Sequence, residues 1–550
     1  MAAPVRVVPL GGLGEIGLNM LLIEQEGAAI AIDCGVLFPE RPGLGIDLLL
    51  PDVSYLRERP GLLRGVVLTH GHEDHIGALA RLLRDIPVPV FGPRFATALA
   101  AEKLRRDKVS APLETVTPGT SFQVGPFTVE PIHVTHSIAD SSALAIGTAQ
   151  GTILHSGDFK FDRHPVDGRV SDLERIAEWG RRGVLLLLSD STNVEHEGES
   201  GSETEVGPRI EELIRTTRGK VLVTTFASHL HRVQQVIDAA VRCGRRVAVA
   251  GRGFEDSTRL AGDLGYLRFP PGGLLSLDEA IESPPEHVAI LISGSQGEAN
   301  SALARLSDGQ YKQLKVGDGD GIILSSRIIP GNERSVQALL NRLAKRGASI
   351  HYGERAHVHV SGHAYRSELR TMIELCRPRY FVPVHGEFRH LDEHRRLAAE
   401  SGIPLDHCFL LEDGDVLEID DGGARTGERV IAGRVLVDGL GEGDIGLEVL
   451  RERRHLSEDG FVVAVLAIHQ QTGEVTSGPE LITRGVVREG ESQEFLDDAK
   501  LAVLEKLREI APESRADLLE VEDEVRRVLK KYFSKTRDRY PLIVPHIFEM

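Results

Sequence analysis

Apolar residues in the first 190 positions gather in short runs of strand length. Runs at 62–68, 152–154 and 184–188 carry few polar side chains, a pattern typical of strands buried on both faces. A polar residue follows each of them: His70, Asp158 and Asp190. Sandwich and α/β folds commonly build their sites at strand ends, so we expect these side chains to belong to a site.

From about residue 205 the pattern changes to alternating strands and helices. This alternation predicts a parallel α/β domain. Strand ends with polar residues resume at 380–385, so we interpret the domain as an insertion. Its predicted strands are 220–226, 246–250, 288–293 and 321–326, and its predicted helices are 231–242 and 335–346.

A Gly- and Asp-rich passage, 413–446, precedes a C-terminal module. The module has two predicted strands and two predicted helices with apolar residues at helical spacing. The strands are 460–469 and 479–487, and the helices are 494–510 and 521–532.

Composition and charge narrow the class of protein. A chain of 550 residues suggests about three or four domains. No apolar stretch reaches the roughly 18 residues of a membrane span, and the N-terminus lacks the apolar segment of a secretory signal. The four cysteines are far apart, which favours reduced thiols, so we expect a cytoplasmic protein without membrane contact. The net charge of −18 argues against a nucleic-acid coat protein but leaves a nuclease possible, because a local basic channel and bound cations attract phosphate.

A glycine-rich turn at 11–17 invites a dinucleotide-binding interpretation. A glycine-rich turn alone is weak evidence, and no acidic residue ends a second strand where a ribose would need it. We therefore prefer a close-packed turn beside a metal site.

The most specific motif is His70-Gly71-His72-Glu73-Asp74-His75, with three histidines and an aspartate in six positions. Imidazole and carboxylate ligands at this spacing suit a borderline metal such as zinc. The H-x-H-x-D-H pattern resembles the metallo-β-lactamase superfamily. That resemblance implies two divalent cations, zinc first and manganese or magnesium as alternatives. The implied ligands are His70, His72 and His136 for one ion, Asp74, His75 and His385 for the other, and Asp158 as the bridge between them.

Three further motifs, 189–193, 360–364 and 382–387, resemble in order and spacing the β-CASP nucleases, and most closely the ribonuclease J family. The likeness extends to segments 9–17, 155–162, 225–229 and 437–439, with one departure at Ala139, where proline is expected. The resemblance implies that His363 protonates the leaving oxygen or stabilises the scissile phosphate, and that Asp190 orients the site. Together with the ligand Asp74, these are the expected catalytic residues.

The resemblance also implies a pocket for the 5′-monophosphate of RNA. Its loops correspond to Ala227, Ser228, His229, His359, Val360, Ser361, Gly362 and His363. Backbone N–H groups, hydroxyls and imidazoles suit a dianion. Ser228 and His229 are equally interpretable as caps of the 231–242 helix, and the two roles can coexist. An accessory cation site, for calcium, is implied at Asp47, the carbonyl of Leu49 and Asp438.

The predicted fold is α/β: a metallo-β-lactamase αββα sandwich with an inserted β-CASP α/β domain and a small α+β C-terminal domain. We expect the sandwich at 1–205 and 370–430, the insertion at 206–369, a linker at 431–460 and the C-terminal domain at 461–550. Among the arginines, Arg242, Arg245, Arg246 and Arg252 are candidates for an RNA path, although a solvated face explains each one alone.

The resemblance predicts a metal-dependent ribonuclease, 5′→3′ exonucleolytic with endonuclease activity, that prefers single-stranded RNA with a 5′-monophosphate. It would act in mRNA decay and rRNA maturation, as a homodimer or homotetramer, with other RNA-decay proteins as candidate partners. Rival hypotheses are a β-CASP enzyme acting on DNA or at RNA 3′-processing sites, and a glyoxalase-II-like hydrolase, which would not need Asp190, His363 or so large an insertion. A non-catalytic RNA-binding scaffold would lack ligands that this chain has.

Overall fold

The computed structural model describes residues 3–39, 45–311, 314–329, 331–439, 441–442, 446–487, 492–511 and 517–550. Two compact units make up the chain: Met1–Glu40 with Leu48–Val435, and Arg41–Asp47 with Leu436–Met550. Among the described residues, none of the helices has the length and apolar character needed to cross a bilayer. All four cysteines are free thiols, as predicted.

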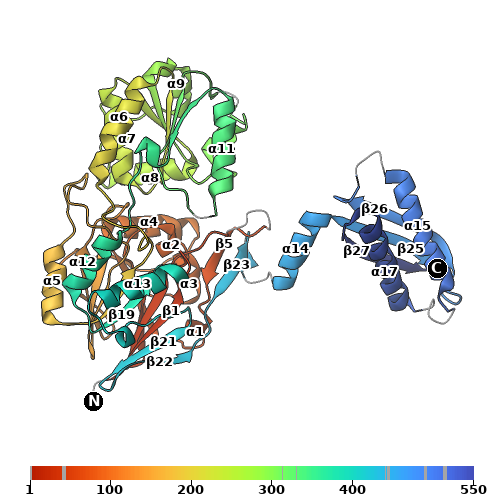
Figure 1. Cartoon of the computed structure of the whole chain (residues 1–550), viewed down its shortest axis with the longest axis horizontal. Coiled ribbons are helices and arrows are strands. Elements are labelled where there is room, and N and C mark those ends of the chain that lie inside the picture. Colours follow the sequence, from red (N-terminus) through yellow and green to blue (C-terminus); the bar gives the residue numbers. More distant parts are fainter. Residues whose placement is uncertain are drawn as a thin grey trace. The chain divides into compact units, whose positions relative to one another are not determined.

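The first unit is built around two sheets that pack face to face (Figure 1). One sheet has the order β22-β21-β1-β3-β4-β6-β7-β8, and the other has the order β19-β13-β12-β11-β10-β9. The strands of the first are β1 Val5–Gly11, β3 Met20–Gln25, β4 Ala28–Ile32, β6 Leu63–Val67, β7 Val90–Gly92, β8 Leu113–Thr115, β21 Asp415–Asp420 and β22 Gly423–Arg429. The strands of the second are β9 Phe122–Val124, β10 Phe127–His133, β11 Ser142–Thr148, β12 Gly151–His155, β13 Val184–Asp190 and β19 Tyr380–Val384.

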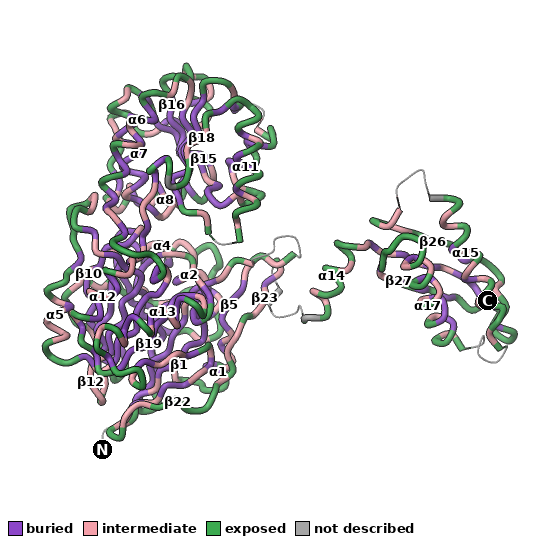
Figure 2. The backbone as a smooth tube through the Cα atoms, viewed as in Figure 1, coloured by how far each residue is buried: buried purple, intermediate pink, exposed green. Residues whose placement is uncertain are grey.

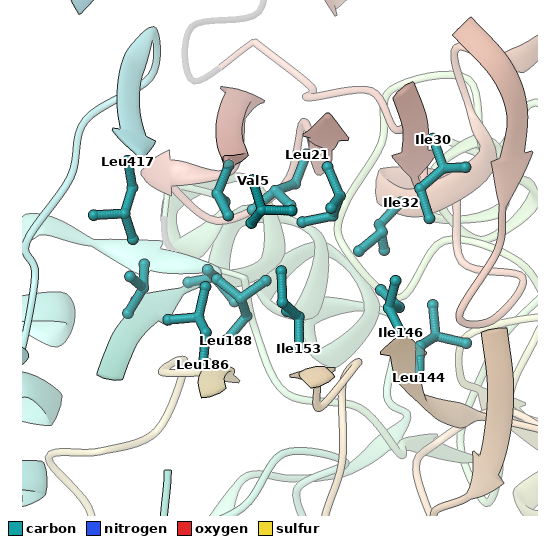
Figure 3. Close-up of a cluster of buried hydrophobic side chains, with 14 of the residues drawn as sticks. Val5, Leu21, Ile30, Ile32, Leu144, Ile146, Ile153, Leu186, Leu188 and Leu417 are labelled. Atoms are coloured by element: carbon teal, nitrogen blue, oxygen red, sulfur yellow. The ribbon is translucent and has the colours of Figure 1, made fainter. Parts of the chain in front are cut away.

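Side chains that alternate along each strand divide between the inner and outer faces of the sheets. Leu186 and Leu188 of β13 point into the layer between the sheets, where they face Val5 and Leu21 of the first sheet (Figure 3). Leu187, between them in sequence, belongs instead to a cluster on the outer face. Both faces of the second sheet are therefore buried, which explains the nearly unbroken apolar runs in the sequence (Figure 2).

Helices cover the outer faces. On the second sheet, α5 Leu173–Arg182, α12 Arg366–Cys376 and α13 Phe388–Glu400 supply apolar residues to the outer cluster. Beside the first sheet, α4 Arg94–Arg106 packs against β7 and β8, and α3 Leu79–Asp85 packs against α4. These layers confirm the predicted αββα sandwich. Shorter elements of this unit are α1 Ser54–Arg57, α2 Glu73–Ile76, β2 Leu13–Gly14, β5 Leu48–Pro51 and β20 Gly386–Glu387.

The insertion leaves the sandwich after β13 and returns at β19. These two strands are parallel neighbours, with Asp190 opposite Val384 at their carboxyl ends. Between them lies a parallel five-stranded sheet of order β15-β16-β14-β17-β18. Its strands are β14 Val221–Thr224, β15 Arg246–Ala250, β16 Val288–Ile292, β17 Gly321–Leu324 and β18 Ser349–Tyr352.

Both faces of this sheet are also covered by helices. Val221 and Val223 pack with α6 Val206–Thr216 and α7 Leu230–Arg242, whereas Leu222 packs with the helices of the opposite face. The other helices of the insertion are α8 Arg252–Asp263, α9 Leu277–Glu282, α10 Ala302–Ser307 and α11 Glu333–Lys345.

The second unit has its own core. Strand β25 Phe461–Ile468 pairs antiparallel with β26 Val475–Arg484 and parallel with β27 Leu542–Glu549. Helices α15 Ser492–Glu509 and α17 Leu518–Arg537 close this core with residues such as Val503 and Leu529. The segment 431–460, predicted as a linker, contains regular elements: β23 Arg434–Asp438, β24 Gly441–Glu442 and α14 Leu447–Asp459.

Candidate metal centre and phosphate pocket

Strand ends from both sheets meet at one rim of the sandwich. In the first sheet, the parallel strands β4 and β6 lead into Asp33 and His70. In the second, the parallel strands β12, β13 and β19 lead into Asp158, Asp190 and His385. Since carboxyl ends of parallel strands lie at one edge, residues scattered over 350 positions become neighbours.

The glycine-rich turn lies beside this rim. The N–H of His385 donates to the carbonyl of Gly12 at 3.0 Å, and His385 has a left-handed backbone with φ 53°. A Cβ on Gly11 would lie 2.2 Å from the carbonyl oxygen of Leu18, so only glycine fits there. The turn is close-packed next to the candidate site, as predicted.

Four of the predicted ligands form a first group, named group 1: His70, His72, His136 and Asp158. One ligand atom from each lies within 4.8 Å of the others. His72 Nδ1 is 3.0 Å from His70 Nε2 and 3.2 Å from His136 Nε2. Asp158 Oδ2 completes the group, at 3.7 Å from His70 Nε2 and 3.8 Å from His136 Nε2.

The remaining predicted ligands form a second group that shares Asp158, named group 2: Asp74, His75, Asp158 and His385. His75 Nε2 is 3.2 Å from Asp158 Oδ2 and 3.6 Å from Asp74 Oδ2. His385 Nε2 is 3.4 Å from Asp74 Oδ2, and His385 Nδ1 is 3.2 Å from Asp158 Oδ1. The structure thus brings all seven predicted ligands into two adjacent groups with one common carboxylate.

Hydrogen bonds on the outer side of the rings fix their orientation. His136 Nδ1 donates to the carbonyl of Gly362 at 2.7 Å. His75 Nδ1 donates to Asp33 Oδ2 at 2.7 Å. Because His136 uses its Nδ1 proton in this outward bond, its Nε2 atom keeps a lone pair that faces group 1, the form of imidazole that binds a metal. Asp33 orients the ring of His75 so that Nε2 faces group 2.

Two observations indicate that a cation belongs between these atoms. His72 Nδ1 lies 3.0 Å from His70 Nε2 and 3.2 Å from His136 Nε2, so three imidazole nitrogens converge on one point. The buried Nε2 of His385 has no hydrogen-bond partner among the described residues. The nitrogen and carboxylate donors therefore fit divalent cations in both groups.

The electrostatics of the rim agree with this fit. Burial, reinforced by neighbouring imidazoles, holds the pKa values of His70 and His136 well below the usual range, so both rings are neutral. Burial also lowers the pKa of His75, but the carboxylates of Asp158 and Asp74 outweigh it and raise that pKa well above its usual value. The rim therefore combines the neutral nitrogen donors of His70 and His136 with carboxylates that favour positive charge beside them.

His363 and Asp190 form a pair next to the two groups. His363 Nδ1 lies 2.8 Å from Asp190 Oδ2, with the carboxylate buried and the imidazole about one-fifth exposed at 21%. Thr192 donates to Asp190 Oδ1 from its N–H at 2.9 Å and its hydroxyl at 2.7 Å. Burial opposes ionisation of Asp190, but His363 and then His385 overcome it and hold the pKa below its usual range. The ring of His363 lies 4.8 Å from that of His136, so one side faces group 1 and another is open to solvent.

The loops predicted for a 5′-phosphate lie at the carboxyl edge of the inserted sheet, at a reversal of strand order that is named the crevice. Strands β14 and β17 are neighbours, but the chain continues from β14 to β15 on one side and from β17 to β18 on the other. Such a reversal opens a ligand crevice at the carboxyl ends of the strands. Ala227, Ser228 and His229 follow β14 there. The segment that begins at Val358 contacts α7, the helix that follows this loop, because the carbonyl of Val358 accepts a hydrogen bond from Arg232 at 2.7 Å.

The capping interpretation of His229 is wrong. His229 occupies the N-cap position of α7, but its side chain makes no capping hydrogen bond. Instead His229 Nε2 lies 3.1 Å from the buried carboxylate of Glu203, which draws the ring away from the helix end. Ser228, half-buried one position earlier, accepts from Leu230 N–H through its backbone carbonyl.

Several buried polar atoms in and beside these loops make no hydrogen bond with a described residue. Among the described residues, His229 Nδ1, Ser326 Oγ and His359 Nδ1 are buried without a hydrogen bond. Ser361 Oγ accepts from Asn193 Nδ2 at 2.7 Å and from His363 N–H at 3.1 Å, which leaves its own proton to donate. Burial next to Arg232 lowers the pKa of His359 to about 3.

The accessory cation site stays a prediction. In the second unit, Asp47 Oδ2 accepts from Gly439 N–H at 2.9 Å, and Asp438 Oδ2 pairs with Arg453 at 2.5 Å. In the first unit, the carbonyl of Leu49 accepts from Leu37 N–H at 3.0 Å.

Two residues of the rim had no role in the sequence-based prediction. Asp33 accepts from the N–H and hydroxyl of Thr69, at 2.8 and 2.7 Å, in addition to His75. Asn19 Nδ2 lies 3.1 Å from His75 Nε2 and from the carbonyl of Asp74. The signal for Asp33 was its place directly after a buried strand; for Asn19 there was none.

Comparisons with known proteins cover most of the chain. The family models that match are the metallo-beta-lactamase superfamily at residues 13–197, the ribonuclease J beta-CASP domain at 218–343, the Zn-dependent metallo-hydrolase RNA specificity domain at 331–409 and the ribonuclease J C-terminal domain at 448–550. A crystal structure of a protein of unknown function from Enterococcus faecalis V583 matches with a TM-score of 0.52 at 16% sequence identity. The match covers 76% of this chain and 100% of the other chain, and at this identity it shows a shared fold alone.

Curated relatives match along nearly the whole length. Ribonuclease J of Mycolicibacterium smegmatis is 42% identical over 547 residues, 99% of this chain and 97% of the relative. Ribonuclease J2 of Bacillus subtilis is 37% identical over 548 residues, 99% of both chains. Ribonuclease J of Helicobacter pylori strain 26695 is 36% identical over 553 residues, 99% of this chain and 79% of the relative. This chain therefore belongs to the ribonuclease J family.

Proposed function

We propose that this protein is a metal-dependent ribonuclease that degrades RNA from the 5′ end, prefers a 5′-monophosphate, and also cuts internally. The observation that carries the proposal is the pair of ligand groups around Asp158 with the His363–Asp190 pair beside them. The glyoxalase-II-like alternative has no use for that pair or for the crevice of the insertion. Family membership supports RNA as the substrate.

Group 1 and group 2 would each hold one divalent cation, with Asp158 as the common ligand. Histidine-rich donor sets favour zinc, and manganese or magnesium are the alternatives. When bound, a pair of cations supplies a nucleophile at neutral pH and stabilises charge on the attacking and leaving oxygens. Asp33 and Gly362 would support the ligands, because they hold His75 and His136 in the binding orientation.

His363 is placed to move a proton. Its Nδ1 is committed to Asp190, which favours an N–H on that side and fixes the orientation of the ring. Nε2 is then the atom that donates to the departing oxygen of the RNA chain. An alkoxide leaving group needs such a donor, and a positioned histidine typically contributes about 10²- to 10⁴-fold to the rate.

The crevice beyond His363 would receive the 5′-phosphate. Ser361 links the crevice to His363, because its hydroxyl oxygen accepts a hydrogen bond from the N–H of His363. The unpartnered atoms of His229, Ser326 and His359 supply polar contacts that a dianion can use. Binding of the 5′ end this close to His363 would place the terminal nucleotide at the metal centre.

The wider context is proposed on family membership alone. It includes mRNA decay, rRNA maturation, assembly into dimers or tetramers, contact with other RNA-decay proteins, and the accessory calcium.

Replacing Ser228 with alanine should weaken the preference for 5′-monophosphate over 5′-hydroxyl RNA. One lost hydrogen bond to a charged group corresponds to about a 10-fold to 100-fold drop in that preference. The measurement follows products from 5′-labelled RNAs that differ only in their 5′ group, with single-stranded DNA of the same sequence alongside.

The wild type should release labelled mononucleotides, fastest from the 5′-monophosphate, and should spare the DNA. Ser335→Ala on α11 is the matched control and should keep the wild-type preference. Cuts confined to internal sites would refute the exonuclease proposal, and an unchanged preference in Ser228→Ala would refute the pocket.

A further inference from the structure

Arg327 is an exposed residue three positions after the end of β17, the strand at the crevice. It donates to Asn193 Oδ1, and its Nη2 lies 3.4 Å from His196 Nε2. Within the described part of the chain, its side chain forms no ion pair with a carboxylate. Other arginines, such as Arg242, Arg366 and Arg389, each have at least one carboxylate partner. Arg327 therefore keeps its full charge for a ligand.

A buried amide links this guanidinium to the proton donor. Asn193 Nδ2 donates to Ser361 Oγ at 2.7 Å and to the carbonyl of His363 at 3.3 Å, while its Oδ1 accepts from Arg327. Both the nitrogen and the oxygen of this one amide are thus hydrogen-bonded, which fixes the side chain between the insertion and the sandwich. The charge of Arg327 consequently lies beside the loop that carries His363.

The backbone of Arg327 is also fixed. The buried side chain of Gln296 donates to the carbonyl of Arg327 at 2.8 Å and accepts from Ile329 N–H at 2.8 Å. On the other side, the carbonyl of Ser325 accepts from the hydroxyl of Thr225 at 3.0 Å. A side chain held in this way loses little conformational entropy when it binds, which favours a binding role over a solvated one.

We propose that Arg327 binds a backbone phosphate of the RNA next to the bond being cleaved, with Asn193 as its positioning residue. The proposal rests on the proposed ribonuclease function and adds a substrate contact to it. A guanidinium offers two parallel N–H donors to a phosphate, the geometry for which arginine is suited. The contact also supplies local positive charge in a chain whose net charge is −18.

The test compares Arg327→Gln with Arg305→Gln. Arg305 is exposed on α10 of the same insertion and stacks on Tyr311 at 4.9 Å, so both variants lose the same charge. For each, kcat/KM is measured on single-stranded RNA at several salt concentrations, together with hydrolysis of bis(p-nitrophenyl) phosphate, metal content and Tm. The small diester reports on the metal centre without a polynucleotide.

Arg327→Gln should lower kcat/KM on RNA about 10- to 100-fold and reduce the salt slope by about 0.7, the value for one phosphate contact on a single strand. Hydrolysis of the small diester, metal content and Tm should stay at wild-type values, and Arg305→Gln should match the wild type. An unchanged salt slope on RNA, or equal losses on RNA and on the small diester, would overturn the contact. Failure of the wild type to cleave RNA would instead overturn the ribonuclease function itself.

Discussion

Asp158→Asn should abolish RNA cleavage and lower the metal content of the purified protein. Asp158 is the one carboxylate that belongs to both group 1 and group 2, so its loss weakens both at once. A metal centre of this kind supplies several kcal/mol of transition-state stabilisation, so a rate loss on the order of 10⁴-fold or more is expected. The measurements are kcat on 5′-monophosphorylated RNA and bound metal per chain.

The matched control is Asp320→Asn. Asp320 is also buried, pairs with Lys220 at 2.9 Å, and precedes the amino end of β17, at the opposite edge of that sheet from the crevice. It should retain wild-type metal content and activity. Substantial cleavage by Asp158→Asn with full metal content would rule out the shared-ligand arrangement.

His363→Ala should lower kcat on RNA by about 10²- to 10⁴-fold and leave metal content unchanged. Its Nδ1 is held by Asp190, and it is outside the seven predicted ligands, so the expected loss is that of a proton donor. A substrate with an aryl leaving group needs little protonation. The variant should therefore hydrolyse bis(p-nitrophenyl) phosphate with a much smaller loss than it shows on RNA.

His351→Ala, on strand β18 of the insertion, controls for the removal of a histidine and should behave as the wild type. If His363→Ala instead loses metal, or loses equal rate on both substrates, then His363 supports the centre rather than the leaving group.

The parts of the site that could be predicted from sequence are those carried by short motifs. His70, His72, Asp74 and His75 lie within six positions, and the apolar runs identified the strands that deliver Asp158 and the others. The layers of the sandwich were implied by the resemblance to the metallo-β-lactamase superfamily. Resemblance to a family then supplied the distant ligands, which no local pattern joins to the motif.

Contacts between distant segments could not be predicted. Arg327 and Asn193 are 134 positions apart and meet only because β13 and the strands of the insertion end at the same place. Asn19 lies 55 positions from Asp74, directly before β3, whereas Asp74 is in α2. Arg245, a candidate for an RNA path, instead lies buried and donates to the carbonyl of Gly219 at 2.6 Å. Exposure and partners are tertiary properties that residue type alone does not reveal.

Helix boundaries show the same limit. The segment 76–83 has helical spacing, but in the structure α2 ends at Ile76 and α3 begins only at Leu79. A Cβ at Gly77 would lie 2.4 Å from the carbonyl oxygen of Glu73 and 2.6 Å from a methyl group of Val36. The turn therefore packs so closely that only glycine fits at this position, a tertiary constraint that the helical spacing does not reveal.

The central claim, that two cations held around Asp158 drive RNA hydrolysis, is tested most directly by metal titration of the stripped protein. Zinc, manganese or magnesium is added in steps while bound metal and cleavage of 5′-monophosphorylated RNA are followed together. The account predicts that two equivalents bind per chain and that full activity appears only as the second equivalent binds. Full activity with one equivalent, or with none, would contradict it.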